Sequence, residues 1–202
     1  MKKSIILFLV FLIYTFFIIT CPAITEWDKG LISFIQSKLS ILPLWIPVLP
    51  DCILYTIMII IPFLIFGIYF YKKRKYMDMV FLASIPLDAF ILNIILKHLV
   101  HRVRPLQEFQ LIIHPHSFSY VSSHSLVTAC LWGLVIFYII KYCKNNILKY
   151  LGITISTLWI LFVGLSRVWI GVHYPTDVLG AYLLASCILL LYFHFINKGI
   201  KL

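Results

Sequence analysis

Residues 79–105 read MVFLASIPLDAFILNIILKHLVHRVRP, an apolar run that ends in a cluster of cations and imidazoles. The apolar part, 79–97, is close to the ~20 residues that a helix needs to cross a bilayer. Lys97, Arg102 and Arg104 stand at its end, and Pro105 favours an extended turn there. The stretch therefore predicts a membrane-spanning helix that carries fixed positive charges to the membrane surface.

Five further segments have a similar length and apolar character. They run approximately over 4–20, 51–71, 123–141, 148–166 and 177–196. Hydrophobic residues make up 62% of the 202 residues, against roughly half in soluble domains. We therefore expect an all-α, polytopic membrane protein with six transmembrane helices, formed by a single domain over 1–202. An amphipathic piece at about 31–42 is expected to lie on the outer surface of the membrane.

Loop charges predict the orientation in the membrane. If the six segments alternate, eleven of the 17 Lys and Arg residues fall on one side. These eleven are Lys2, Lys3, Lys72, Lys73, Arg74, Lys75, Lys141, Lys144, Lys149, Lys198 and Lys201. By the positive-inside rule, both termini are cytoplasmic and the loops after the third and fifth segments face outward. We expect a bacterial inner (cytoplasmic) membrane protein whose active site faces the periplasm or the exterior.

The net charge of +10 could suggest nucleic-acid binding. The basic residues, however, lie in short loops between apolar segments and form no basic domain, so we expect a membrane partner and no nucleic acid.

Three patches far apart in the sequence carry residues suited to phosphate chemistry. They are Lys97–Pro105, Ser122-Ser123-His124, and Ser166-Arg167 through His173 to Asp177. Each patch stands at the end of an apolar segment on the same predicted side of the membrane. Lysine and arginine bind phosphate oxygens, arginine often through two parallel hydrogen bonds.

Two histidines in these patches could act in catalysis. His124 lies at the start of the fourth segment, where Ser122 and Ser123 can cap the helix and free backbone N–H groups can bind an anion. His124 could donate a proton to a leaving oxygen. Asp177 stands one helical turn beyond His173 and could accept its N–H, which would orient the imidazole as a nucleophile. Snorkelling cations and a polar helix cap are the alternative interpretation of these residues.

At these residues the chain resembles the type-2 phosphatidic acid phosphatase superfamily, whose fold is shared by vanadium haloperoxidases and bacterial acid phosphatases. The family pattern is Lys-x6-Arg-Pro, then Pro-Ser-Gly-His, then Ser-Arg-x5-His-x3-Asp. The stretches Lys97–Pro105 and Ser166–Asp177 match the first and third parts in full. In the second part, Val121 replaces the proline and Ser123 replaces the glycine.

The resemblance implies a role for each matching residue. His173 would be the nucleophile that forms a phosphohistidine, Asp177 would orient it, and His124 would be the general acid. The residues that would hold the phosphoryl oxygens are Lys97, Arg104, Ser122, Ser123 (through its backbone N–H) and Arg167. Ser123 adds a side chain at a crowded point, so rate or substrate size could differ from those of relatives.

No metal and no cofactor are expected, because two-metal phosphatases need clustered carboxylates and only Asp177 is predicted to lie in the site. The outward-facing site and apolar scaffold favour a lipid phosphate or diphosphate as substrate. Undecaprenyl pyrophosphate is the leading candidate, with phosphatidylglycerophosphate, phosphatidic acid and lipid A phosphates as alternatives.

Functions of other classes stay open from the sequence. Six helices with a cationic cluster could transport an anion, although transport has no need for an oriented nucleophile such as His173. A catalytically inactive, lipid-binding member of the family is the other alternative, because Val121 and Ser123 depart from the motif.

Overall fold

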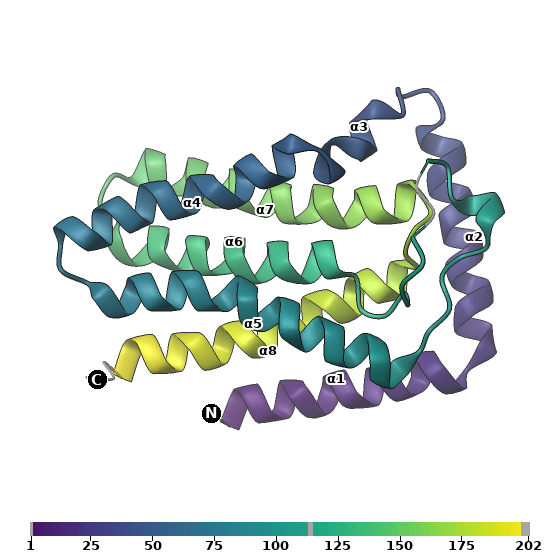
Figure 1. Cartoon of the computed structure of the whole chain (residues 1–202), viewed down its shortest axis with the longest axis horizontal. Helices are drawn as coiled ribbons and strands as arrows, with labels where there is room; N and C mark the ends of the chain where they lie inside the picture. Colours follow the sequence, from purple (N-terminus) through teal and green to yellow (C-terminus); the bar gives the residue numbers. More distant parts are fainter. Residues whose placement is uncertain (1, 113–114, 199–202) are drawn as a thin grey trace.

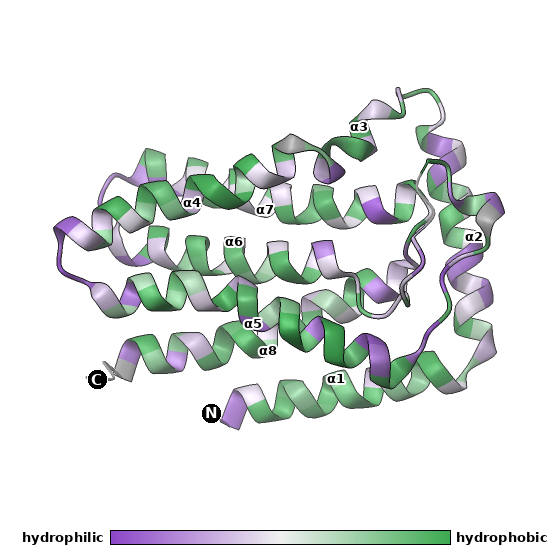
Figure 2. Cartoon of the chain, viewed as in Figure 1, coloured by the Kyte–Doolittle hydropathy of each residue, from purple (hydrophilic) through white to green (hydrophobic). Residues whose placement is uncertain are grey.

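The computed structural model describes residues 2–112 and 115–198, and all regular structure in these ranges is helical (Figure 1). Within them, six helices are long and apolar enough to cross a membrane. These are α1 (Lys2–Thr20), α4 (Ile53–Lys72), α5 (Tyr76–Val100), α6 (Ser123–Tyr142), α7 (Asn146–Trp169) and α8 (Pro175–Lys198). The predicted all-α fold with six transmembrane helices is confirmed. Figure 2 shows apolar residues along these helices and hydrophilic residues gathered near their ends.

Most of the helices extend a few residues beyond the apolar runs that predicted them. Helix α5 begins at Tyr76 and continues to Val100, so Lys97 lies in its last turn. The next residue, His101, has φ of 52° and ends the helix in the left-handed conformation. An apolar run marks only the part of a helix inside the hydrocarbon, whereas the helix continues until its backbone hydrogen bonds are interrupted.

Helix α6 forms the centre of the bundle and packs against α5, α7 and α8. Its side chains Leu126, Leu131 and Leu134 are fully buried. Helix α1 packs along α8, where the hydroxyl of Ser4 donates a hydrogen bond to the carbonyl of Cys187. Large apolar side chains are exposed on the outer faces of α1, α4 and α5, as expected for a surface that lipid covers.

One end of the bundle is covered by the segment between α1 and α4. It contains α2 (Pro22–Leu39), the short α3 (Trp45–Val48) and the 3₁₀ turn η1 (Leu49–Asp51). Figure 1 shows α2 running across this end of the bundle. Ile32 of α2 is fully buried and packs with Val168, Tyr174 and Val178. The expected surface piece at 31–42 thus overlaps the second half of a longer helix that ends at Leu39.

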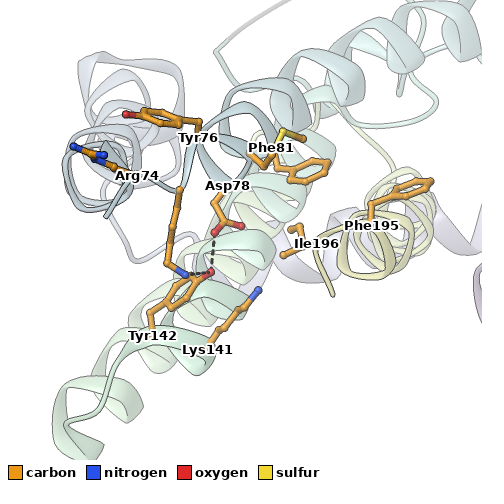
Figure 3. A pocket seen from close by; sticks show the side chains of 10 residues that line it. Arg74, Tyr76, Asp78, Phe81, Lys141, Tyr142, Phe195 and Ile196 are labelled. Carbon is orange, nitrogen blue, oxygen red and sulfur yellow. Dashed lines mark hydrogen bonds between the residues drawn. The ribbon is translucent and has the colours of Figure 1, made fainter. Parts of the chain in front are cut away.

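The opposite end carries both ends of the described chain, with the turns after α4 and α6 (Figure 1). A cavity of about 430 Å³ lies there. Beside it, Lys75 Nζ donates to Tyr142 Oη at 3.2 Å, and Tyr142 Oη donates to Asp78 Oδ2 at 2.7 Å (Figure 3). No predicted site residue lines this cavity.

Candidate active site

The three sequence patches converge on a cavity of about 300 Å³ at the end of the bundle that α2 covers. Six of the eight predicted site residues line it: Lys97, Arg104, Ser123, His124, Arg167 and His173. They come from the end of α5, the loop that follows it, the first turn of α6, the last turn of α7 and the loop before α8. The ends of three helices and two loops thus bring these six residues together.

The cations of the first patch are held by the loop that leads into α6. Lys97 Nζ donates to the carbonyl of Phe118 at 2.7 Å and to Ser117 Oγ at 3.2 Å. Arg104 donates to the carbonyls of Ser117 and Val172 at 2.6 and 2.5 Å. Burial lowers the pKa of Arg104 to about 10 despite the opposing field of Asp177, and the guanidinium stays charged at neutral pH.

The geometry around His173 determines which ring nitrogen faces the cavity. Arg104 Nη1 lies 3.3 Å from His173 Nε2. A guanidinium can only donate, so Nε2 accepts and the proton of the neutral ring is on Nδ1. Nδ1 lies 3.4 Å from Ser119 Oγ and 3.6 Å from Asp177 Oδ2. The Nε2 lone pair is therefore directed at Arg104, which also lines the cavity, and the Asp177 carboxylate lies on the Nδ1 side of the ring.

Ser119 stands between the histidine and the carboxylate. Its hydroxyl donates to Asp177 Oδ2 at 2.5 Å, and the backbone N–H of Tyr174 donates to the same oxygen at 2.9 Å. Ser119 can therefore accept from His173 Nδ1 while it donates to Asp177. The predicted pairing of His173 with Asp177 is present as a three-residue arrangement.

Burial controls the protonation of His173, whose side chain is 3% exposed. Desolvation lowers the pKa of His173 to about 3; the Asp177 carboxylate acts in the opposite direction and the Arg104 guanidinium in the same direction. The imidazole is consequently neutral at physiological pH and keeps the lone pair that a nucleophile requires.

Arg102 compensates the buried charge of Asp177. Its Nη1 donates to Asp177 Oδ1 at 2.5 Å, and its Nη2 donates to Asp28 Oδ2 at 2.8 Å. Burial alone would lower the pKa of Arg102, but the fields and hydrogen bonds of Asp177 and Asp28 raise it. Asp28 also accepts hydrogen bonds from the backbone N–H and hydroxyl of Thr176 at 3.1 and 2.5 Å. Helix α2 is thereby attached to the first turn of α8.

The serines at the start of α6 differ in position. Ser122 occupies the N-cap but makes no side-chain capping bond, so the predicted cap is wrong for this residue. It is fully buried and accepts a hydrogen bond from Ser125 Oγ at 2.9 Å. Ser123 lines the cavity, and its hydroxyl donates to Asn93 Oδ1 of α5 at 2.6 Å. The side chain that replaces the family's glycine is thus held by α5.

The expectation that Asp177 is the one carboxylate of the site is wrong. Asp51, at the end of η1, also lines the cavity. Its Oδ1 lies 2.6 Å from Arg167 Nη1 and 3.5 Å from His124 Nε2. Asp177 itself does not line the cavity and lies behind His173.

Gly171 allows the loop before His173 to turn. Its φ is +72°, and a Cβ at this position would collide with the carbonyl oxygen of Phe109. The loop is further held by Leu111, whose backbone N–H donates to the carbonyl of Ile170 at 3.1 Å. A side chain at position 171 would displace the loop that carries His173.

Sequence reasoning missed Asp51, Ser119, Asp28 and the role of Arg102. Arg102 lies within the first motif, two residues before Arg104. That position could have indicated a role in the site. Asp28 precedes the piece at 31–42 that was expected at the membrane surface, and no local feature of the sequence marks this carboxylate as buried.

Comparisons with known proteins identify the family of the chain and its similarity to a solved structure. A family model of the PAP2 superfamily matches residues 78–201. Phosphatidylglycerophosphatase B of Bacillus subtilis (strain 168) is 35% identical over 131 residues, which are 63% of this chain and 60% of that relative's length. The crystal structure of the first transmembrane PAP2 type phosphatidylglycerolphosphate phosphatase from Bacillus subtilis superposes with a TM-score of 0.80. That similarity covers 100% of this chain and 99% of the other, at 28% identity.

Fold and cavity together define a multi-pass membrane protein with a cationic site at one end of a helical bundle. The chain belongs to the PAP2 superfamily, and the predicted family is confirmed. It is a membrane member of this superfamily of phosphatases, like the solved structure that it resembles over its full length.

Proposed function

We propose that the chain hydrolyses a lipid phosphate at the membrane surface through a phosphohistidine on His173. The observation that carries this proposal is the orientation of the imidazole. Its Nε2 lone pair is directed at Arg104, one of the three cations that line the cavity, while its Nδ1 faces Ser119 and Asp177. A site that only bound or transported an anion would need the cations without an oriented nucleophile.

In the first step, a phosphoryl oxygen takes over the hydrogen bond that Arg104 donates to His173 Nε2, and the freed Nε2 lone pair attacks the phosphorus and forms a P–N bond. The P–O bond to the lipid breaks, and its electron pair stays on the leaving oxygen, which takes a proton from the imidazolium form of His124. Lys97, Arg104 and Arg167 stabilise the negative charge on the phosphoryl oxygens. The Nδ1–H of the now cationic ring is stabilised by the carboxylate of Asp177, directly or through Ser119.

In the second step, water attacks the phosphorus and gives its proton to His124. The P–N bond breaks, its electron pair returns to His173 Nε2, and inorganic phosphate leaves. Both histidines then have their original protonation, so the cycle closes without another co-reactant.

An apolar cavity beside the site supports a lipid as the substrate. It has a volume of about 440 Å³ and lies among α4, α5 and α6. Ile59, Leu87 and Phe90 are among the residues that line it, and it shares Ser123 and His124 with the cationic cavity. A phosphate in the cationic cavity could thus be continuous with a hydrocarbon chain in the apolar one.

Phosphatidylglycerophosphate is the lipid that we propose first. It was an alternative on sequence grounds, and the names of both relatives favour it over undecaprenyl pyrophosphate. We further propose that the site faces the periplasm or the exterior, because the loops at the opposite end carry the excess of lysines.

The test is release of inorganic phosphate by purified protein in detergent with a metal chelator. Phosphatidylglycerophosphate, undecaprenyl pyrophosphate and phosphatidic acid would be compared, with His173→Ala alongside. We expect chelator-resistant release, fastest from phosphatidylglycerophosphate, and a loss of roughly 10³-fold or more in the variant. No release from any of these lipids by folded protein would contradict the proposal, and faster release from undecaprenyl pyrophosphate would overturn the substrate assignment alone.

A further inference from the structure

The cationic cavity contains a negative charge of its own. Three cations line it, Lys97, Arg104 and Arg167, and among its lining residues Asp51 is the single carboxylate. The cations repel one another, and the field of Arg167 contributes to the lowered pKa of Arg104. With no substrate bound, this concentration of positive charge needs a counter-charge.

Arg167 is the cation that Asp51 neutralises. The guanidinium is almost fully buried, and each nitrogen donates to a neighbour. Nη1 donates to Asp51 Oδ1 at 2.6 Å, Nη2 donates to the carbonyl of Pro47 at 3.3 Å, and Nε donates to Ser166 Oγ at 3.1 Å. Asp51 is the only charged group among these partners, and its side chain is 17% exposed.

Asp51 Oδ1 lies between two groups that the proposed reaction assigns to the phosphate. This one atom lies 2.6 Å from Arg167 Nη1 and 3.5 Å from His124 Nε2. In the proposed reaction, the arginine holds a phosphoryl oxygen and the histidine faces the leaving oxygen. A carboxylate oxygen therefore already occupies a point on which both groups converge.

We propose that Asp51 is a positioning residue that stands in for the phosphoryl group when the site is empty. It holds the buried Arg167 guanidinium and the His124 ring in place, and the negative phosphoryl group displaces it from Arg167. This assignment rests on the proposed function, because it identifies the cavity as the phosphate site. Asp51 lies outside the three motifs, in the segment before α4.

Two consequences follow for binding and turnover. The Asp51 charge opposes phosphate, so its removal strengthens binding of inorganic phosphate, the product of the reaction. Its hydrogen bond positions Arg167, so truncation of the side chain lowers kcat. Asn removes the charge and keeps an oxygen acceptor, whereas Ala removes both, and the two substitutions separate these effects.

The experiment measures binding of inorganic phosphate by calorimetry, together with kcat and KM, for purified wild-type protein and variants. We expect Asp51→Asn to bind phosphate roughly tenfold more tightly, because a nearby like charge has been removed. Asp51→Ala should show a fall in kcat that Asp51→Asn largely avoids. Asp51→Glu, which restores a carboxylate, should return phosphate affinity toward the wild-type value.

The control is Glu26→Gln, which removes one exposed carboxylate that pairs with Lys29 on α2 and should leave phosphate affinity unchanged. Unchanged or weaker phosphate binding by Asp51→Asn, in active protein with a normal Tm, would overturn the role of Asp51 and leave the proposed function standing. Absence of both phosphate binding and lipid hydrolysis in every form would overturn the two together.

Discussion

Ser119 donates a 2.5 Å hydrogen bond to the Asp177 oxygen that faces the His173 ring. The carboxylate therefore reaches the imidazole in part through a hydroxyl, because Nδ1 is 3.4 Å from Ser119 Oγ and 3.6 Å from the carboxylate oxygen. In this arrangement, the hydroxyl fixes the distance and direction of the charge that stabilises the ring as it becomes cationic.

Ser119→Ala should therefore impair turnover more than substrate binding. We expect kcat to fall by roughly 10- to 100-fold with a small change in KM, because the hydroxyl acts on the ring and not on the phosphate. Initial-rate kinetics on the preferred lipid would measure kcat and KM separately. Ser186→Ala, which removes a hydroxyl bonded to the Tyr182 carbonyl of α8, is the matched control. A rise in KM with unchanged kcat would contradict this role.

Arg102→Met should destabilise the protein. Asp28 and Asp177 are fully buried, and the substitution leaves both carboxylates without their cation, which costs about 3–5 kcal/mol of the free energy of unfolding. Thermal denaturation in detergent would show a lower Tm. Adding Asp28→Asn removes one of the two unpaired charges and should recover part of the lost stability. Equal Tm values for the wild type and Arg102→Met would show that the network has no structural role.

Acid should destabilise the protein through His173. The pKa of His173 is lowered to about 3 in the folded state, against about 6.5 in an unfolded chain. Between these pH values the unfolded chain binds a proton that the folded chain does not, so the free energy of unfolding falls as pH falls. The Tm of the wild type should decline more steeply from pH 7 to pH 4 than that of His173→Asn. NMR of ¹⁵N-labelled histidine would contradict this if the His173 ring titrated near pH 6.5.

Gly171→Ala should disturb the catalytic loop. The residue has φ of +72° and no room for a Cβ beside the Phe109 carbonyl. We expect a loss of about 1–2 kcal/mol in stability from the backbone conformation, and a larger fractional loss of activity because His173 is two residues away. Gly67→Ala is the control, since a Cβ there meets nothing within 4 Å. Full activity in Gly171→Ala would show that the loop can rearrange without consequence.

Cysteine labelling can test the predicted orientation. Cys52 is exposed and follows Asp51 at the cavity end, whereas Cys143 follows α6 at the opposite end. In intact cells, a membrane-impermeant thiol reagent should label a variant that retains only Cys52. A variant that retains only Cys143 should react after permeabilisation. The reverse pattern would place the site in the cytoplasm.

The six helices and three motif patches were predictable because each has a local pattern. Apolar runs of spanning length predict membrane helices without reference to the rest of the chain, and the loop charges mark their ends. Successive spanning helices alternate in direction, so the third and fifth of them end on the same side of the membrane. The sequence therefore places three cations on that side: Lys97, Arg104 and Arg167. The exact helix ends were harder to predict from the sequence. His101, for example, ends α5 through its left-handed backbone conformation, and no glycine marks this position.

The remaining parts of the site depend on contacts between distant positions. Asp51 and Arg167 are 116 positions apart, and Asp28 and Thr176 are 148 apart. Ser119 and Asp177 are separated by 58 positions. A carboxylate at a predicted membrane surface is ordinarily solvated, so neither Asp28 nor Asp51 has a local feature that predicts an ion pair. The tertiary arrangement alone determines which cation each one meets.

The attachment of α2 to α8 has a geometric consequence. Asp28 accepts two hydrogen bonds from Thr176, the residue before Asp177, so α2 is fixed to the first turn of α8, which directly follows the loop that carries His173. Trp27, beside Asp28, is exposed, and tryptophan prefers the depth of the lipid headgroups. If His173 acts as we propose, its Nε2 should therefore stay at a constant depth relative to the lipid headgroups. We would then expect the protein to prefer lipids whose phosphorus lies at the depth of this nitrogen.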